Sequence, residues 1–255
     1  MIFTSENNWY SWSYGNGPKF GRQQSNDKLQ THYEKFNGYV SSFSKEMTNA
    51  AASTLEHYPN LRPSILFSGG VDSEIVLRSY LKIGSNPKVY IIRYENDYNI
   101  YDVSYAVTIC SLLNVDYTII DFNLQKFYEN DAEKISELAQ ICRPRALPQC
   151  KFVDLVEGLP IICSSDLTGV RTNDDYNVKG TWLIRCWEHD IGWSKYLRET
   201  NRPGIAEWFK WTPGLVISFT QLKWFNNITN DKYYGKTGFN STKIIGYKEA
   251  FPDLI

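Results

Sequence analysis

The residues of this chain with the clearest capacity for chemistry are "SGGVDS" at positions 68–73, which follow the short apolar run "ILF". Two adjacent glycines let a backbone come close to a ligand, and a helix that starts beside them offers free amide groups and the positive end of its dipole. Ser68 and Ser73 can donate hydrogen bonds to phosphate oxygens. Asp72 suits such a site if a Mg²⁺ ion or a substrate amine is held there as well. The stretch therefore predicts a loop that binds an anion such as phosphate.

Two widespread phosphate-binding loops do not match this stretch. The dinucleotide fingerprint G-x-G-x-x-G separates its first two glycines, and the Walker loop G-x-x-x-x-G-K-[ST] requires a lysine. In this chain Gly69 and Gly70 are adjacent and no lysine follows them. The loop belongs to a different class.

Placed between an apolar strand and a helix, "SGGVDS" resembles the signature of the N-type ATP pyrophosphatases, or PP-loop family. This family includes the asparagine, GMP, NAD and argininosuccinate synthetases. The resemblance implies that ATP is cleaved between its α and β phosphates and that AMP is placed on a carboxylate or carbonyl oxygen of a small-molecule acceptor. A nitrogen nucleophile then displaces AMP. ATP and Mg²⁺ are the implied cofactors.

The resemblance also implies roles for individual residues. Asp72 would be the catalytic and Mg²⁺-binding carboxylate, and a late lysine, Lys236 or Lys243, would offset the charge on the departing pyrophosphate. The implied nucleotide contacts are the loop residues Ser68, Gly69, Gly70, Val71, Asp72 and Ser73 for pyrophosphate, and the backbone of Ile92, Arg93 and Tyr94 for adenine. For Arg93, a surface ion pair with Glu95 is an equally good interpretation.

The order of elements favours the asparagine-synthetase-like branch, in which a later strand ends in a substrate-binding loop. The corresponding segment here is "CSSDLTG", with Ser165 and Asp166 as candidate substrate residues, but it lacks the glutamate of that branch. Arg143 and Arg145 either line the mouth of the substrate site or belong to a surface loop stiffened by prolines. With no glutaminase domain expected, nitrogen would come from ammonia, an amine or a separate donor.

Two alternatives stay open at this point. The chain could be an ATP-binding or assembly protein that has lost catalysis, an alternative that the incomplete match of "CSSDLTG" and the aromatic residues at the N-terminus support. It could also be a PP-loop enzyme that modifies a nucleobase or nucleotide, although the CxxC pairs of the thiolating members are absent.

The elements that must position these residues follow an alternating pattern. Apolar runs at 63–68, 88–94, 116–123 and 158–166 predict strands, and amphipathic segments at 71–84, 101–115 and 124–144 predict the helices between them. Such alternation predicts an α/β fold with a doubly wound parallel sheet, the Rossmann-like fold of adenine nucleotide α hydrolases. Before the first strand, residues 26–58 predict a long amphipathic helix, broken or bent near Gly38.

The chain divides into three predicted parts. Residues 1–25 form an aromatic N-terminal arm, 26–170 the ATP pyrophosphatase α/β domain, and 171–255 a mostly helical C-terminal lobe packed on the same domain. In that lobe Trp208, Phe209 and Trp211 are interpreted as core packing in preference to a substrate clamp.

Composition excludes several classes of protein. A net charge of −1 without a block of like charges makes nucleic acid an unlikely partner, and no apolar stretch is long enough for a membrane helix, so a cytoplasmic protein is expected. Five cysteines and three histidines show no metal-binding spacing. A homo-oligomer is compatible with this composition.

Overall fold

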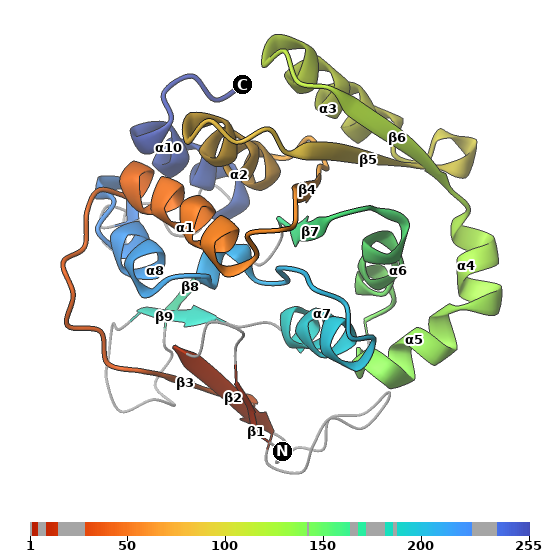
Figure 1. The fold of residues 1–255 in the computed structure, drawn as a ribbon, viewed down its shortest axis with the longest axis horizontal. Coiled ribbons are helices and arrows are strands. Elements are labelled where there is room, and N and C mark those ends of the chain that lie inside the picture. The colour runs from red at the N-terminus through yellow and green to blue at the C-terminus, as the bar shows by residue number, and fades with distance from the viewer. Residues whose placement is uncertain are drawn as a thin grey trace.

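A computed structural model describes residues 2–4, 9–14, 29–141, 143–163, 168–171, 182–185, 188–225 and 239–255. Its centre is a sheet of four parallel strands in the order β6-β5-β4-β7 (Figure 1). The strands are β4 (Pro63–Leu66), β5 (Lys88–Tyr94), β6 (Tyr117–Phe122) and β7 (Leu159–Ile162). All four coincide with runs that the sequence predicts as strands.

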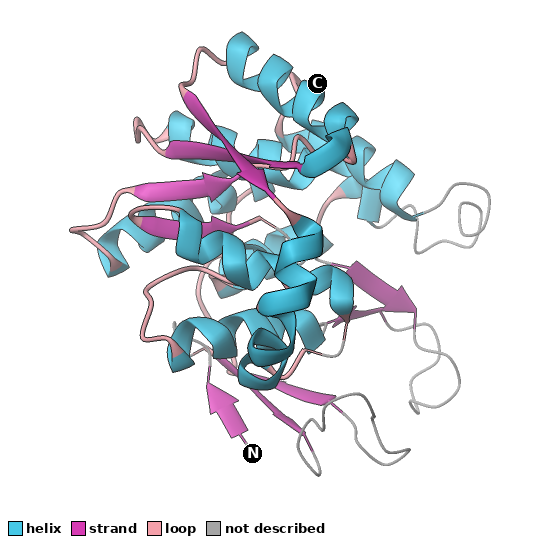
Figure 2. Ribbon diagram, turned by 90° about the vertical axis from the view of Figure 1, so that its right-hand side faces the viewer, coloured by secondary structure: helices cyan, strands magenta, loops and turns pink. Residues whose placement is uncertain are grey.

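The connections between these strands cover both faces of the sheet, as Figure 2 shows. On one face, α2 (Val71–Lys82) and α3 (Ile100–Leu112) link β4 to β5 and β5 to β6. The return from β6 to β7 carries α4 (Leu124–Asn130), α5 (Ala132–Ala139) and α6 (Pro148–Leu155) on the other face. The predicted doubly wound α/β fold is therefore confirmed, with the reversal of winding between β4 and β7.

Neighbouring residues along each strand belong to two separate hydrophobic clusters. Ile65 and Ile161 are buried in the cluster that contains α2 and α3, whereas Leu66 and Ile162 pack with α5 and α6. Because successive side chains of a strand point to opposite faces, a strand covered on both sides needs apolar residues at every position. This is why the strands read as unbroken apolar runs.

The prediction of one helix over residues 26–58 is wrong in its first half. Residues Leu29–Tyr33 form β3, which pairs antiparallel with β2 (Tyr10–Tyr14), and β2 pairs with β1 (Ile2–Thr4). Helix α1 spans only Phe43–His57, because the Ser42 side chain caps its first turn. The spacing of aromatic residues imitated a helical period, but pairing with a distant strand decided the structure.

The N-terminal sheet crosses the predicted boundary at residues 25 and 26, while the division into three parts stays a prediction. Trp9, just before β2, packs against the main core and its indole N–H donates to the carbonyl of Lys210 at 2.8 Å. The N-terminal strands and the C-terminus lie at opposite ends of the molecule (Figures 1 and 2).

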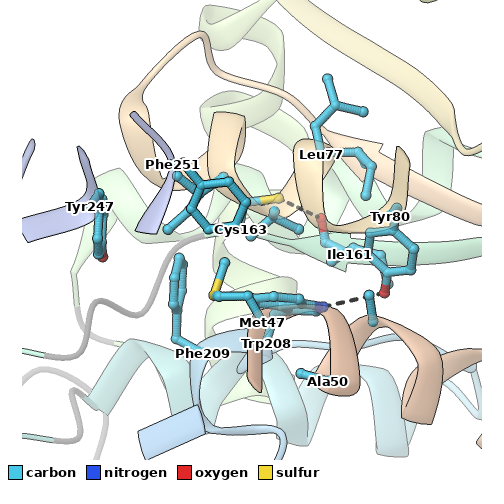
Figure 3. Close-up of a cluster of buried hydrophobic side chains, with 14 of the residues drawn as sticks. Met47, Ala50, Leu77, Tyr80, Ile161, Cys163, Trp208, Phe209, Tyr247 and Phe251 are labelled. Atoms are coloured by element: carbon cyan, nitrogen blue, oxygen red, sulfur yellow. Dashed lines mark hydrogen bonds between the residues drawn. The ribbon is translucent and has the colours of Figure 1, made fainter. Parts of the chain in front are cut away.

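The C-terminal part is largely helical but also contains a two-stranded antiparallel sheet. Its elements are β8 (Thr168–Arg171), β9 (Trp182–Arg185), α7 (Glu188–Glu199), α8 (Pro213–Thr220) and α10 (Phe239–Ala250). The aromatic residues predicted as core, Trp208, Phe209 and Trp211, are buried, and the Trp208 indole donates to the Tyr80 hydroxyl at 3.2 Å (Figure 3). Among the described residues, no helix combines the length and apolar character needed to cross a bilayer.

A buried carboxylate on α2 holds the last residues of the chain. Glu74 is 1% exposed and accepts hydrogen bonds from Nε of Arg78 at 2.8 Å and from the backbone N–H of Ile255 at 3.3 Å. The Arg78 guanidinium also donates to the carbonyl of Asp253 at 3.0 Å and pairs with its carboxylate. Glu74 therefore has a structural role, fixing residues 253–255 against the helix that follows the "SGGVDS" loop.

We expect Glu74→Gln to lower the free energy of unfolding by about 1.5–3 kcal/mol, because it weakens hydrogen bonds to a charged group. Urea unfolding followed by circular dichroism measures this loss. Asp253→Asn is the matched control, since the Asp253 carboxylate is exposed and an exposed ion pair contributes less than about 1 kcal/mol. Equal losses in the two variants would contradict the role given to Glu74.

Candidate functional site

The "SGGVDS" stretch forms the turn between β4 and α2. The N–H of Phe67 donates to the carbonyl of Tyr90 at 2.8 Å and so extends the sheet by one bond before the chain turns away. Gly69 has a φ of +77°, a left-handed conformation that favours glycine. Gly70 is the N-cap of α2 and provides no side-chain cap, so the first amide groups of the helix are not covered by a capping side chain.

The two serines of the loop meet at this helix start. The Ser73 hydroxyl donates to the carbonyl of Gly70 at 2.8 Å, and the N–H of Gly70 donates to the Ser68 hydroxyl at 3.3 Å. The two hydroxyl oxygens are 3.3 Å apart. Ser73 is 2% exposed, so it supports the loop from inside, while Ser68 faces the adjoining cavity.

This cavity has a volume of about 260 Å³ and lies at the carboxyl end of the sheet, where the winding reverses between β4 and β7. Crevices at this place are where open α/β sheets bind their ligands. The lining comes from the ends of β4, β5 and β7, from the loop, and from the starts of α3 and α6. Its members are Leu66, Phe67, Ser68, Gly70, Asp72, Ile91, Ile92, Tyr94, Asn99, Asp102, Val103, Gln149, Phe152, Ile162 and Cys163.

Two carboxylates, Asp72 and Asp102, line the cavity, and its described lining includes no lysine or arginine. Oδ1 of Asp72 accepts a hydrogen bond from the Tyr247 hydroxyl of α10 at 2.8 Å. No group of three potential metal-binding side chains occurs among the described residues. Mg²⁺ needs no such group when it binds through one or two carboxylates and the phosphates of a substrate, so these two aspartates fit that ion.

The predicted basic residues differ in what the structure says of them. Lys236 lies outside the described residues. Position 243 lies in α10, four residues before Tyr247, and positions i and i+4 fall on the same face of a helix. The hydroxyl of Tyr247 reaches Asp72, and the role of position 243 stays a prediction.

Two ionisable side chains of the lining stay protonated at neutral pH. Burial, together with the neighbouring Asp72 charge, raises the pKa of the Cys163 thiol far above its ordinary value. Burial, followed by the nearby Tyr128 and Asp102, raises the pKa of Tyr94 to about 12. Because a thiolate is the reactive form of cysteine, this burial disfavours a nucleophilic role for Cys163. Cys110 and Cys150 are likewise buried free thiols.

Arg93 does not line the cavity, although Ile92 and Tyr94 on either side of it do. Alternation along β5 turns its side chain the other way, where it forms an ion pair with Asp121 at 2.6 Å. The predicted partner Glu95 instead accepts from the backbone N–H groups of Leu124 and Gln125 at the start of α4. The surface ion pair was thus predicted correctly as a type of interaction, but with the wrong partner.

Of the predicted substrate residues, only Arg143 and Arg145 lie within the described part of the chain. Arg143 and Arg145 lie around a short turn of 3₁₀ helix (Pro144–Ala146), and neither belongs to the cavity lining. The helix that follows this turn, α6, contributes Gln149 and Phe152 to the cavity lining. Ser165 and Asp166 lie outside the described residues. Neither arginine is part of the cavity lining, and the choice between a substrate mouth and a surface loop stays a prediction.

Sequence reasoning missed Asn99, Asp102, Gln149 and Tyr247. The first two begin the helix after β5, and the rule that ligands bind beyond the carboxyl ends of parallel strands would have drawn attention to them. Tyr247 is separated from Asp72 by 175 positions, and nothing in its local sequence indicates that contact.

The structure defines a doubly wound α/β protein with a cavity at the switch point of its parallel sheet. No family model matches the chain, and no curated protein matches its sequence. Partial structural similarity exists to NMN synthetase from Francisella tularensis, with 17% identity, a TM-score of 0.37 and coverage of 48% of this chain and 53% of that one. NH3-dependent NAD synthetase from Campylobacter jejuni subsp. jejuni is 20% identical, with a TM-score of 0.34 and coverage of 48% of this chain and 56% of that one. NAD+ synthetase from Burkholderia pseudomallei is 17% identical, with a TM-score of 0.29 and coverage of 48% of this chain and 52% of that one. The chain spans about half the length of each of these structures, and overlaps this partial do not define an activity.

Proposed function

We propose that this protein is an ATP-dependent ligase that forms AMP and pyrophosphate. In the proposed reaction an oxygen of a small-molecule acceptor attacks the α phosphate of ATP, the bond between the α and β phosphates breaks, and pyrophosphate leaves. A nitrogen nucleophile then attacks the adenylated carbon and displaces AMP. Ammonia, an amine or a separate donor supplies the nitrogen.

One observation carries this proposal: the serine and glycine loop before α2 opens, with Asp72, onto a cavity at the switch point of the sheet. Uncapped amide groups and the Ser68 hydroxyl suit phosphate oxygens. Two carboxylates alone would repel a polyphosphate, but they suit one that arrives with Mg²⁺. Because AMP is a good leaving group, positioning and charge neutralisation would supply most of the rate.

The test is to incubate the full chain with ATP, Mg²⁺, ammonium and a set of carboxylic acid acceptors, and to measure AMP and pyrophosphate. We expect both products in equal amounts with an accepted acid, and neither when Mg²⁺ is removed with a chelator. Release of ADP and phosphate would contradict the proposed bond cleavage.

A second candidate is an ATP-binding protein without turnover, favoured by the lack of a basic side chain in the described lining of the cavity. For this candidate ATP would raise the thermal unfolding temperature, and no acceptor would yield AMP. The same samples therefore separate the two functions.

A further inference from the structure

Two backbone groups at the end of β5 face the place where β4 has stopped pairing. The last register pair between these strands is Leu66 with Tyr90, and the carbonyl of Tyr90 still accepts from Phe67. Alternate residues of a strand direct their backbone groups to the same neighbour, so the carbonyl of Ile92 and the N–H of Tyr94 point to the same side. On that side β4 has ended and the cavity begins.

The side-chain amide of Asn99 occupies both of these groups. Its Nδ2 donates to the carbonyl of Ile92 at 2.8 Å, and its Oδ1 accepts from the N–H of Tyr94 at 2.8 Å. Asn99 is half-buried and belongs to the cavity lining together with both residues that it contacts. The amide therefore fills the last two hydrogen-bonding positions of the strand edge inside the cavity.

This use of Asn99 leaves the following helix without its cap. Asn99 is the N-cap residue of α3, where an asparagine side chain normally accepts from the N–H of the second or third helical residue, here Tyr101 or Asp102. No such bond forms. The Asn99 side chain thus bonds to the backbone of β5 and not to the nearby N–H groups at the start of α3.

The donor and acceptor that Asn99 presents match one edge of adenine. An amino N–H that donates stands beside an oxygen that accepts, as the N6 amino group of adenine stands beside N1. We propose that Asn99 is a placeholder that a nucleotide displaces: the base takes over Ile92 and Tyr94, and Asn99 turns to cap α3. This inference rests on the proposed nucleotide function of the cavity and adds a specificity-determining residue to it.

The exchange conserves hydrogen bonds. The two backbone groups are paired before and after, first with the amide and then with the base, and the released Asn99 oxygen gains the helix cap. Leaving these groups unpaired would cost about 1–3 kcal/mol for each buried one. A placeholder keeps the site formed without a ligand and selects a base edge with the same order of donor and acceptor.

Asn99→Ser separates the two positions of the side chain. Serine is a good N-cap, but it is too short to bridge Ile92 and Tyr94, so the variant can cap α3 but has no placeholder. Only the ligand-free protein is destabilised. We therefore expect calorimetry to show that ATP binds Asn99→Ser about 3- to 10-fold more tightly than it binds the wild type, since about 1.4 kcal/mol corresponds to tenfold. Inorganic tripolyphosphate has no base and should bind both proteins equally.

A second measurement uses the wild-type protein and does not depend on the variant's stability in the calorimeter. The side-chain NH2 signal of Asn99 in a 15N-labelled sample, assigned by its loss in Asn99→Ser, should shift on saturation with ATP and stay in place with tripolyphosphate. An unchanged signal with ATP, or weaker ATP binding by the variant, would overturn the placeholder. If the wild type binds neither ATP nor tripolyphosphate, the nucleotide function itself fails, which is a distinguishable result.

Discussion

For the proposed reaction, we expect Asp72→Asn to lower the formation of AMP and pyrophosphate strongly while the fold stays intact. The substitution removes the negative charge but keeps an oxygen that can accept from the Tyr247 hydroxyl, 2.8 Å away in the wild type. Loss of one preorganised electrostatic group typically lowers turnover by about 100- to 1000-fold. Product release measures the activity, and thermal unfolding should show a transition close to that of the wild type.

Tyr247→Phe is the matched control for this prediction. It removes the hydroxyl that orients Asp72 and leaves the carboxylate and the aromatic packing in place. We expect a smaller loss of turnover and a higher Mg²⁺ concentration for half-maximal rate, because the carboxylate is present but less well held. Full activity in Asp72→Asn would remove Asp72 from the mechanism.

Gly69→Ala lowers the free energy of unfolding by about 2–5 kcal/mol, because two penalties add. The left-handed φ of +77° costs an alanine about 1–2 kcal/mol. Its Cβ would also lie 2.7 Å from the carbonyl oxygen of Asp102 and 2.8 Å from the backbone nitrogen of Ala106, so α3 must move at a cost of about 1–3 kcal/mol. Denaturant unfolding measures the sum.

Two other glycines separate these penalties. Gly84 has a similar φ of +75° and nothing within 4 Å of the position that a Cβ would take, so Gly84→Ala should show only the conformational cost. Gly70→Ala meets only the Ser68 hydroxyl, at 3.4 Å, and should fold like the wild type. Equal destabilisation by Gly69→Ala and Gly84→Ala would show that the contact with α3 does not matter.

The central sheet was predictable because its strands are apolar runs buried on both faces and alternate with helical segments. Local sequence carries that information. The loop at 68–73 was predictable for a similar reason, since its glycines and its place after a strand are local features. Asp72, Ser68 and Gly70 do lie at the cavity.

The features that could not be predicted from the sequence depend on contacts between residues far apart in the chain. The region of β3 resembles part of a helix until β2 is placed beside it, and Arg93 acquires its partner only when β5 and β6 pair in register. Asn99 occupies a typical N-cap position. Its side chain bonds to β5 instead, because β4 ends before it could pair with Ile92 and Tyr94. Each of these depends on which strand lies next to which.

The bond between Tyr247 and Asp72 has a consequence for how the protein is made. The two residues are 175 positions apart, and at a synthesis rate of about 5–20 residues per second the second is added roughly 10–35 s after the first. During that interval the β4–α2 loop can leave the ribosome with its carboxylate still unoriented. A nascent chain therefore lacks the hydrogen bond that holds the Asp72 carboxylate until α10 has docked.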